Sequence, residues 1–307
     1  MHPAVAIFPG ALGDLLLALP ALRALRARHR VAALTLVVSE PLRALARLAA
    51  VADRVESLDG PGTAWLFGAG RRPAWLAGRP AVYAWIGSRD PGVAARLGAV
   101  ASHVELFAVE RGDGPLHAAV AYARGVGLAA CEPADLAQAA RLAVPTTPAA
   151  EAVRARGAGP LLALHRGAGA SAKRWSRAAF EIVARRWCES GGAVIDLLGP
   201  AEADEAALAE ALPVRCWPLP DVAALLAAAT AYVGCDSGVS HLAGAAGARG
   251  AVVFGPTQPR RWHPLSPLLV PLGPARDGVA VRADEVLALL GGMPSLTSQE
   301  ADTIDPQ

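Results

Sequence analysis

The segment Gly234-Cys-Asp-Ser-Gly-Val-Ser-His-Leu-Ala-Gly-Ala-Ala-Gly247 decides the fold, because it combines a buried strand, a tight turn and a helix start. The apolar run from Tyr232 to Cys235 predicts the strand, Ser237-Gly238 predicts the turn, and a helix is expected from His241 to Ala248. A strand that passes directly into a helix is typical of a parallel sheet. Ligands of such sheets bind beyond the carboxyl ends of the strands, so this turn is a candidate binding site.

The same alternation surrounds this segment on both sides. Further strands are expected at residues 161–165, 193–198 and 251–254, and helices at residues 177–190, 203–211, 222–229 and 284–290. The second half of the chain therefore predicts one doubly wound α/β unit.

The first half of the chain repeats the pattern. Strands are expected at residues 4–8 and 34–38, and helices at residues 41–49 and 116–126. Gly13-Asp14 opens a further helix with a leucine stripe, which Pro20 is expected to kink. Residues 59–89 are irregular and predict strands with long loops.

Two stretches rich in proline and glycine, Pro-Thr-Thr-Pro and Gly-Ala-Gly-Pro, lie between Val144 and Pro160 and predict a linker. The length of 307 residues also suits two domains. We therefore expect an α/β fold with two Rossmann-like, doubly wound domains, residues 1–150 and 151–290, followed by a flexible tail at 291–307.

Composition excludes several classes of protein. Hydrophobic residues make up 53% of the chain and the mean hydropathy is +0.34, but no run of 18 uncharged apolar residues occurs. The net charge is only +2, and no basic stripe is interleaved with aromatic residues, so nucleic acid is not an expected partner. The four widely spaced cysteines form no metal motif and suit a reduced, cytoplasmic protein.

Lysine is almost absent from the sequence. Of the 29 basic residues only Lys173 is a lysine, and the chain has no asparagine. Lys173 ends a glycine-containing loop that begins at His165 after a predicted strand, where one ammonium group is suited to clamp a phosphate. The alternative is a lysine that has persisted by chance on the surface.

Two helix starts carry the remaining candidates. Amides at the start of the helix after Asp236 carry partial positive charge and suit a diphosphate, with Gly238 allowing close approach. Alternatively, Asp236 or Ser240 only caps that helix. Asp14 is either a cap or a general base that takes a proton from an acceptor hydroxyl. Thr257, in the proline-rich loop after residue 254, is a further candidate contact to the ligand.

Four ordered segments together resemble glycosyltransferase family 9, the ADP-heptose:lipopolysaccharide heptosyltransferases. They are Leu12-Gly-Asp-Leu-Leu-Leu-Ala-Leu-Pro-Ala-Leu22, the loop His165 to Trp175, Asp-Ser-Gly-Val-Ser-His at 236–241 and Phe-Gly-Pro-Thr at 254–257. The resemblance extends from about residue 4 to residue 290.

The resemblance implies a GT-B fold, in which two Rossmann-like domains face a central cleft, with the acceptor at the first and the donor at the second. It implies that Asp14 is the catalytic base, with Gly13 beside it, and that Lys173 contacts the donor phosphate. The implied donor-binding residues are Gly169, Ser171, Glu202 (at the ribose), Asp236, Ser237, Gly238, His241 and Thr257. The chain departs from the family in having no hydroxyl between Gly167 and Ala170, and residues 60–115 match no particular member.

The resemblance implies a metal-independent, inverting transferase that needs no cofactor and acts on an ADP-sugar donor, with heptose as the expected sugar. The chain contains no Asp-x-Asp pair, which agrees with this mechanism. The expected acceptor is a lipid-linked saccharide of the lipopolysaccharide type at the cytoplasmic face of the inner membrane, where peripheral contact is expected. Arginines 23, 26, 28 and 30 either aid that contact or form a solvated helix face. Two alternatives are a nucleotide-sugar epimerase of the same fold and a non-catalytic nucleotide-binding protein.

Overall fold

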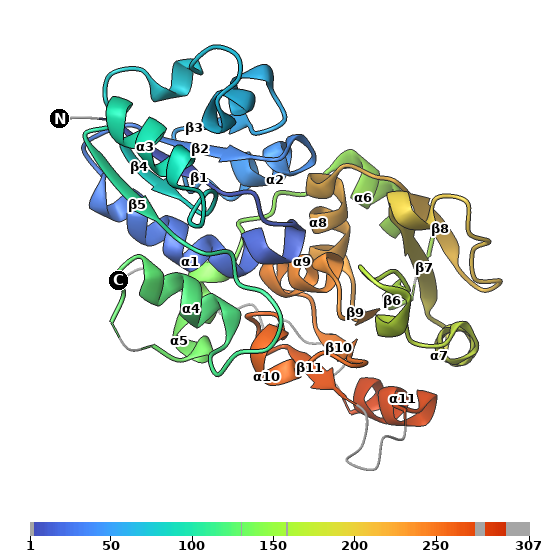
Figure 1. The fold of residues 1–307 in the computed structure, drawn as a ribbon. Helices are drawn as coiled ribbons and strands as arrows, with labels where there is room; N and C mark the ends of the chain where they lie inside the picture. Colours follow the sequence, from blue (N-terminus) through green and yellow to red (C-terminus); the bar gives the residue numbers. More distant parts are fainter. Residues whose placement is uncertain (1–2, 130, 158, 274–279, 293–307) are drawn as a thin grey trace, which may run out of the picture.

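The computed structural model describes residues 3–129, 131–157, 159–273 and 280–292, and within them it contains two parallel sheets (Figure 1). The first sheet has the strand order β3-β2-β1-β4-β5. Its strands are β1 (Ala4–Ile7), β2 (Leu34–Val38), β3 (Arg54–Ser57), β4 (Ala81–Ala84) and β5 (His103–Leu106). The central strand β1 is buried at every residue, which suits a strand covered on both faces.

The second sheet has the order β11-β10-β9-β6-β7-β8. Its strands are β6 (Leu161–His165), β7 (Ala193–Leu198), β8 (Leu212–Arg215), β9 (Ala231–Cys235), β10 (Gly250–Val253) and β11 (Leu269–Leu272). In each sheet the strands are added first on one side of the earliest strand and then on its other side. This change of direction lies between β1 and β4 in the first sheet and between β6 and β9 in the second. Ligands of doubly wound sheets bind at this switch point.

Side chains alternate between the two faces of β1. Ala4 and Ala6 face α1 (Leu12–Arg28), α2 (Arg43–Leu48), α4 (Ala118–Gly125) and α5 (Pro133–Ala140). Val5 and Ile7 face a second cluster under α3 (Pro91–Val100) and the short 3-10 helices at Pro61–Phe67 and Ala74–Leu76. This period of two is the expected pattern of a buried strand.

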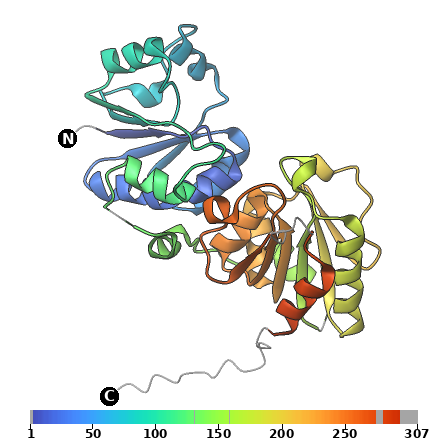
Figure 2. The ribbon, with the colours of Figure 1, turned by 60° about the horizontal axis from the view of Figure 1, so that its bottom comes forward.

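The second sheet is also covered on both faces. One face carries α6 (Pro148–Arg154), α8 (Leu219–Ala228) and α9 (Gly238–Ala246), and the other carries α7 (Arg177–Glu189) and α11 (Ala283–Gly291). The short helix α10 (Pro259–Trp262) follows β10 on the side of the first domain (Figure 2).

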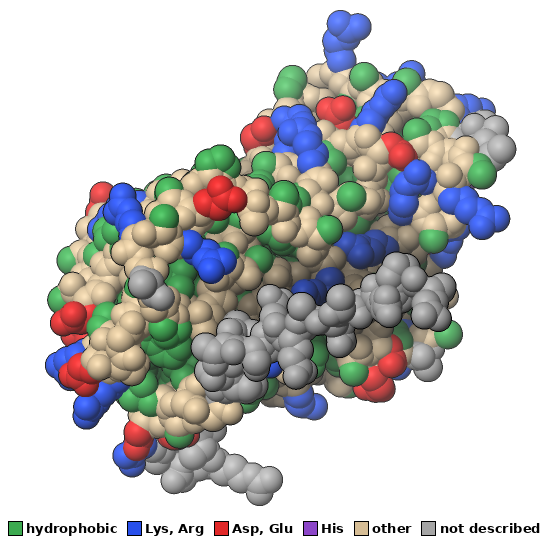
Figure 3. Space-filling model, turned by 180° about the vertical axis from the view of Figure 1, so that it is seen from behind, with side chains coloured by type: hydrophobic (Ala, Val, Ile, Leu, Met, Phe, Trp, Pro, Cys, Tyr) green, Lys and Arg blue, Asp and Glu red, His purple; other side chains and the backbone are tan. Residues whose placement is uncertain are grey.

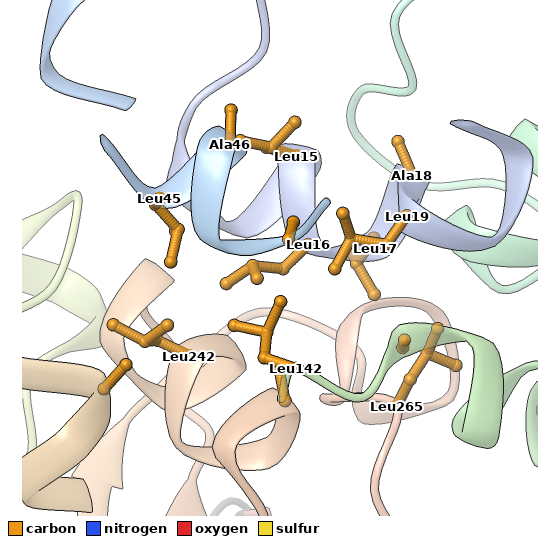
Figure 4. Close-up of a cluster of buried hydrophobic side chains, with 14 of the residues drawn as sticks. Leu15, Leu16, Leu17, Ala18, Leu19, Leu45, Ala46, Leu142, Leu242 and Leu265 are labelled. Atoms are coloured by element: carbon orange, nitrogen blue, oxygen red, sulfur yellow. The ribbon is translucent and has the colours of Figure 1, made fainter. Parts of the chain in front are cut away.

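The two domains share one continuous hydrophobic core. Leu16 on α1 and Leu242 on α9 belong to the same buried cluster, together with Leu142 from the connecting segment (Figure 4). The amide of Leu142 donates to the carbonyl of Ala245 at 2.9 Å, which fixes the connection to α9. The helix starts that line the cleft are therefore positioned by side chains from both domains.

The structure corrects several local predictions. Residues 203–211 do not form a helix, because arginines take the carbonyls that a helix would use: Arg166 and Arg177 both donate to Ala206, and Arg215 donates to Ala203 and Glu205. Helix α9 begins at Gly238, three residues before the predicted start. Elements not anticipated from the sequence are β3, β5, β8, β11, α3, α5 and α10, whereas β4 lies within residues 59–89, where strands were expected.

Helix α1 continues through Pro20, so this proline does not end it. The predicted tail lies almost entirely outside the described residues, since α11 ends at Gly291 and residues 293–307 are not described. Among the described helices, none has both the length and the apolar character that a membrane crossing requires.

Candidate functional site

A cavity of about 550 Å³ lies at the carboxyl ends of both sheets and is lined by residues of both domains. Nine of the residues predicted from the sequence line it: Gly13, Asp14, Gly169, Lys173, Asp236, Ser237, Gly238, His241 and Thr257. Ser171 and Glu202 do not line it. The structure thus brings together the starts of α1 and α9, which lie more than 220 residues apart in the chain.

The two helix starts are in direct contact. A Cβ atom placed on Gly13 would lie 2.9 Å from Cδ2 of His241, and one placed on Gly238 would lie 2.9 Å from Cβ of Leu12. Both positions therefore require glycine, for close approach rather than for an unusual backbone angle. Two helix N-termini at one cavity concentrate the partial positive charge that attracts an anion.

Helix α9 has its own cap. The Ser237 hydroxyl accepts from the amide of Ser240 at 3.4 Å, so Ser237 caps the helix, while Asp236 has other partners. Asp236 is buried, and its Oδ2 accepts from Lys173 Nζ at 2.8 Å and from Thr257 Oγ1 at 2.5 Å. Lys173, half-buried in this pair, thereby places the single ammonium group of the chain at the edge of the cavity.

Asp14 lies in the first turn of α1, is half-buried, and lines the cavity from the side of the first domain. Its Oδ2 accepts from the amide of Ala11 and its Oδ1 from the hydroxyl of Tyr122, each at 3.2 Å. Burial raises the pKa of Asp14, and the Tyr122 and Ala11 hydrogen bonds and the nearby Arg111 partly oppose that shift. A carboxylate of raised pKa that is accessible from a cavity is suited to take up a proton.

Several residues of the site were missed by sequence reasoning. The segment 110–116 between β5 and α4 contributes Glu110, Arg111, Gly112 and Asp113 to the cavity, and Trp262 comes from α10. The only signal in the sequence is the charged run Glu-Arg-Gly-Asp soon after residues 103–106, which form β5. This run was not recognised because β5 itself was not predicted.

The segment 110–116 also borders a second cavity, of about 970 Å³, which lies mainly in the first domain. The lining of this cavity includes Trp85 to Asp90 after β4 and Ala108 to Arg111 after β5. Glu110, Arg111 and Asp113 line both cavities. The two cavities are thus neighbours, with Asp14 lining only the smaller one.

Glu202 lies in a neighbouring polar network, whereas Ser171 is exposed in the short 3-10 helix Ser171–Lys173. Glu202 is buried, and its carboxylate accepts from Arg174 Nη2 at 2.8 Å and from the amide of Gly199 at 3.2 Å. Arg166 is buried beside it and forms bonds with Asp196. These pairs order the loop that follows β7 at the rim of the second sheet.

The fold and the cavity between two doubly wound domains define the class: this is an α/β protein of the GT-B fold. The structure of the E. coli ADP-heptose lps heptosyltransferase II superposes with a TM-score of 0.73 at 17% identity, covering 94% of this chain and 98% of that one. The glycosyl transferase family 9 protein of Veillonella parvula DSM 2008 gives 0.73 at 16% identity, with 94% and 96% covered. E. coli heptosyltransferase WaaC with ADP gives 0.65 at 18% identity, with 94% and 99% covered.

The family model of glycosyltransferase family 9 (heptosyltransferase) matches residues 116–277, more than half of the chain. The chain therefore belongs to glycosyltransferase family 9, and the resemblance seen in its motifs is confirmed. A search of curated proteins finds no match.

The buried side chain of His241 tests whether water enters the contact between the two helix starts. The side chain is buried, its Nδ1 has no hydrogen-bond partner among the described residues, and burial lowers its pKa to about 4. The pKa of an unfolded histidine is about 6.5, so the unfolded state binds more protons between pH 4 and 6.5. We predict that His241 contributes a loss of stability as the pH falls through this range.

The measurement is a histidine NMR titration, in which the Cε1 resonance that disappears in His241→Gln is followed in the parent protein. We expect a midpoint near 4, well below the value of about 6.5 for an unfolded histidine. A midpoint near 6.5 for His241 would show that water reaches the ring and that the packing against Gly13 is loose.

Proposed function

We propose that this chain is an inverting, metal-independent glycosyltransferase that transfers heptose from ADP-heptose to a saccharide acceptor of the lipopolysaccharide type. The observation that carries the proposal is a single cavity that contains Asp14 from one domain and Lys173 with the start of α9 from the other. The donor is inferred from similar structures, two of which are named as heptosyltransferases, one of them with ADP. Family membership favours transfer over the epimerase and the non-catalytic binding protein.

The reaction is a single displacement. The acceptor oxygen forms a bond to the anomeric carbon of the donor while the bond from that carbon to the diphosphate oxygen breaks. Asp14 takes the proton of the acceptor hydroxyl, and ADP leaves with the bonding electron pair. Attack from the side opposite the leaving group inverts the anomeric configuration.

The second domain stabilises the charge that develops on ADP. The amides of Ser237 and Gly238 at the start of α9, together with the Lys173 ammonium, supply fixed positive charge without a metal ion or another cofactor. Lys173 Nζ and Thr257 Oγ1 both donate to Oδ2 of Asp236, and these contacts hold the Lys173 ammonium at the cavity. Gly169 borders the same space without a side chain that would obstruct the phosphates.

The ribose of the donor is assigned to the loop that follows β7. Glu202 is the candidate, and its two known contacts leave further acceptor positions on the carboxylate for a ribose hydroxyl. Ser171, in the short 3-10 helix Ser171–Lys173, is the first hydroxyl of the loop and is assigned to the donor side.

The acceptor is assigned to the larger cavity in the first domain, because this cavity shares the segment 110–116 with the donor cavity. Its volume of about 970 Å³ suits a saccharide of more than one unit. An acceptor sugar placed there would extend a hydroxyl towards Asp14.

Asp14→Asn should fold normally and transfer sugar very slowly. Asparagine keeps one side-chain oxygen and therefore one of the two contacts, to Tyr122 or to Ala11, but its amide cannot take up a proton near neutral pH. General-base assistance is worth about 10²–10⁴-fold, so we expect kcat to fall at least about 100-fold, with the melting temperature and the affinity for ADP unchanged. The assay is transfer from ADP-heptose to a lipopolysaccharide precursor.

Asp135→Asn is the matched control, because Asp135 also lies in the first turn of a helix and accepts from the amide three residues before it, at 2.8 Å, but lines neither cavity. It should retain a rate close to that of the parent. A parental rate for Asp14→Asn would show that another group is the base.

ADP and ADP-sugars should raise the melting temperature, while UDP-sugars and NAD should have little effect. At 100 times its Kd a ligand adds about 2.7 kcal/mol to the free energy of unfolding. In Lys173→Ala the ligand-induced shift should nearly disappear, because a hydrogen bond to a charged group contributes about 1.5–3 kcal/mol. The measurement is the shift between free and liganded protein, since loss of the Asp236 partner also alters the free form.

Lys173→Arg tests the geometry of the same contact. A planar guanidinium does not replace a compact ammonium, so this variant should also have reduced activity. Equal stabilisation by UDP-sugars would remove the ADP assignment, and full activity of Lys173→Arg would show that any cation suffices at this position.

We assign the contact with the inner membrane to the first domain. Three of the four arginines considered on α1 have internal partners: Arg23 donates to the Arg141 carbonyl, Arg26 pairs with Asp53 and Arg28 pairs with Glu105. Basic side chains project from the end of the molecule formed by this domain (Figure 3, upper right). The internal partners of Arg23, Arg26 and Arg28 favour the alternative of a solvated helix face over membrane contact for these arginines.

The segment 60–89 suits an anionic lipid surface better. It contains four arginines, Arg71, Arg72, Arg79 and Arg89, and no acidic residue. Within the described part of the chain none of these arginines forms an ion pair, and Phe67 nearby is 54% exposed. Arginines beside an exposed aromatic ring are suited to the headgroup region of an anionic bilayer.

The double variant Arg71→Ala/Arg72→Ala should bind vesicles of phosphatidylcholine with 30% phosphatidylglycerol more weakly than the parent in co-sedimentation. Each arginine near such a surface is worth about 1 kcal/mol, so a roughly tenfold or larger loss is expected. The control is Arg185→Ala/Arg186→Ala, an exposed pair on α7 of the other domain, which should bind as the parent does. Equal loss in both variants would show that binding follows net charge rather than this surface.

A further inference from the structure

Arg261 of the second domain is buried against the segment 110–116 of the first. Its side chain is 4% exposed and donates to Glu110 Oε2 at 2.8 Å, to the Gly112 carbonyl at 2.7 Å and to the Leu116 carbonyl at 2.7 Å. A Cβ atom on Gly114 would lie 2.6 Å from Nη1 of Arg261, so the segment fits closely around the guanidinium. These contacts connect α10 to the part of the first domain that borders both cavities.

The same segment leads to the proposed base through one hydroxyl group. The backbone amide of Glu110 donates to the Tyr122 oxygen at 3.3 Å, and the Tyr122 hydroxyl donates to Asp14 Oδ1 at 3.2 Å. Because an amide can only donate, it fixes the direction of the tyrosine proton towards Asp14. Burial raises the pKa of Tyr122, so this hydroxyl keeps its proton throughout the accessible pH range.

Tyr122 itself has little freedom. The residue is 1% exposed on α4, and its ring packs edge-on against Phe8 with the centroids 5.6 Å apart. The hydroxyl group is therefore placed by the core of the first domain and oriented by the segment that Arg261 binds.

We propose that Tyr122 is a positioning residue that holds the Asp14 carboxylate for proton transfer, and that Arg261 keeps this arrangement in register with the donor domain. The inference rests on the proposed role of Asp14 as the base. It assigns to the contact between the domains a function in catalysis, namely that the base is oriented only while α10 is docked on the segment 110–116.

The arrangement predicts a change in the pH profile. The hydrogen bond from Tyr122 favours the charged form of Asp14, so its removal raises the pKa of Asp14 further. The other charged groups near Asp14 are Glu110 and Arg111 on the segment, and Lys173, Asp236 and His241 across the cavity. His241, with a pKa of about 4, stays neutral above pH 5 and does not interfere with the measurement.

The experiment is the pH dependence of kcat between pH 5 and 9 for Tyr122→Phe. We expect the acidic limb to move upwards by about one pH unit, as loss of a hydrogen bond to a charged group implies, with the KM for the donor unchanged. The matched control is Tyr83→Phe, because Tyr83 is also buried and its hydroxyl bonds to His29 outside both cavities. Tyr83→Phe should leave the profile unchanged.

Arg261→Lys tests the second half of the proposal. It keeps the charge but loses the fork that reaches Glu110, Gly112 and Leu116 together, so the acidic limb should again move upwards, by less than in Tyr122→Phe. If Arg261→Lys lowers the melting temperature but keeps the parental pH profile, the proposed coupling between the orientation of Asp14 and the donor domain is wrong.

Asp14→Asn is measured in parallel to separate the inference from the proposed function. If Asp14→Asn loses its activity while Tyr122→Phe keeps the parental profile, the positioning role is wrong and the base assignment stands. If Asp14→Asn keeps the parental rate, the base assignment itself is wrong, and the positioning role is overturned with it.

Discussion

The contact between the first turns of α1 and α9 is the constraint on which the rest of the structure depends. Gly13 lies against His241 and Gly238 lies against Leu12, at distances that leave no room for a Cβ atom at either glycine. This contact brings the carboxylate of Asp14 and the amides of α9 to one cavity, although they belong to different domains. A larger side chain at either glycine would separate the domains at the point where chemistry is proposed.

The hydrophobic core and the Arg261 contact hold this arrangement from two sides. Below the helix starts, Leu16 of α1 and Leu242 of α9 share one buried cluster (Figure 4). Beyond the cavity, all three guanidinium nitrogens of Arg261 donate to the segment 110–116. A guanidinium buried in this way is costly unless its donors are satisfied, so the contact fixes one relative position of the two domains.

Much of the fold and of the site could be predicted, for a physical reason. In a parallel sheet the residues after each strand collect at one edge, so the turn at Asp236 and the loop at Lys173 meet at the edge of the second sheet. The helix start at Asp14 lies at the corresponding edge of the first sheet, and the docking of the two domains brings the two edges to one cavity. Gly13 and Gly238 were recognised as part of motifs, but their close contact with the opposite domain could not be read from either segment alone.

The incorrect predictions and the missed residues have physical reasons as well. Residues 203–211 have a helical composition, yet arginines distant in sequence bind their carbonyls. Tyr122 and Arg261 carry no local pattern, since their roles arise from contacts to Glu110 that only the assembled domains create. Residues 59–106 contain short strands whose partners are supplied by the rest of the sheet, and tertiary pairing overrides their weak local preference.

The most direct test of this account is an experimental structure of the protein with ADP bound. The diphosphate should lie within hydrogen-bonding distance of the amides of Ser237 and Gly238 and of Lys173 Nζ, with its terminal phosphate facing Asp14 across the cavity. A nucleotide found instead in the larger cavity beside Trp85 to Asp90, with the start of α9 unoccupied, would contradict it.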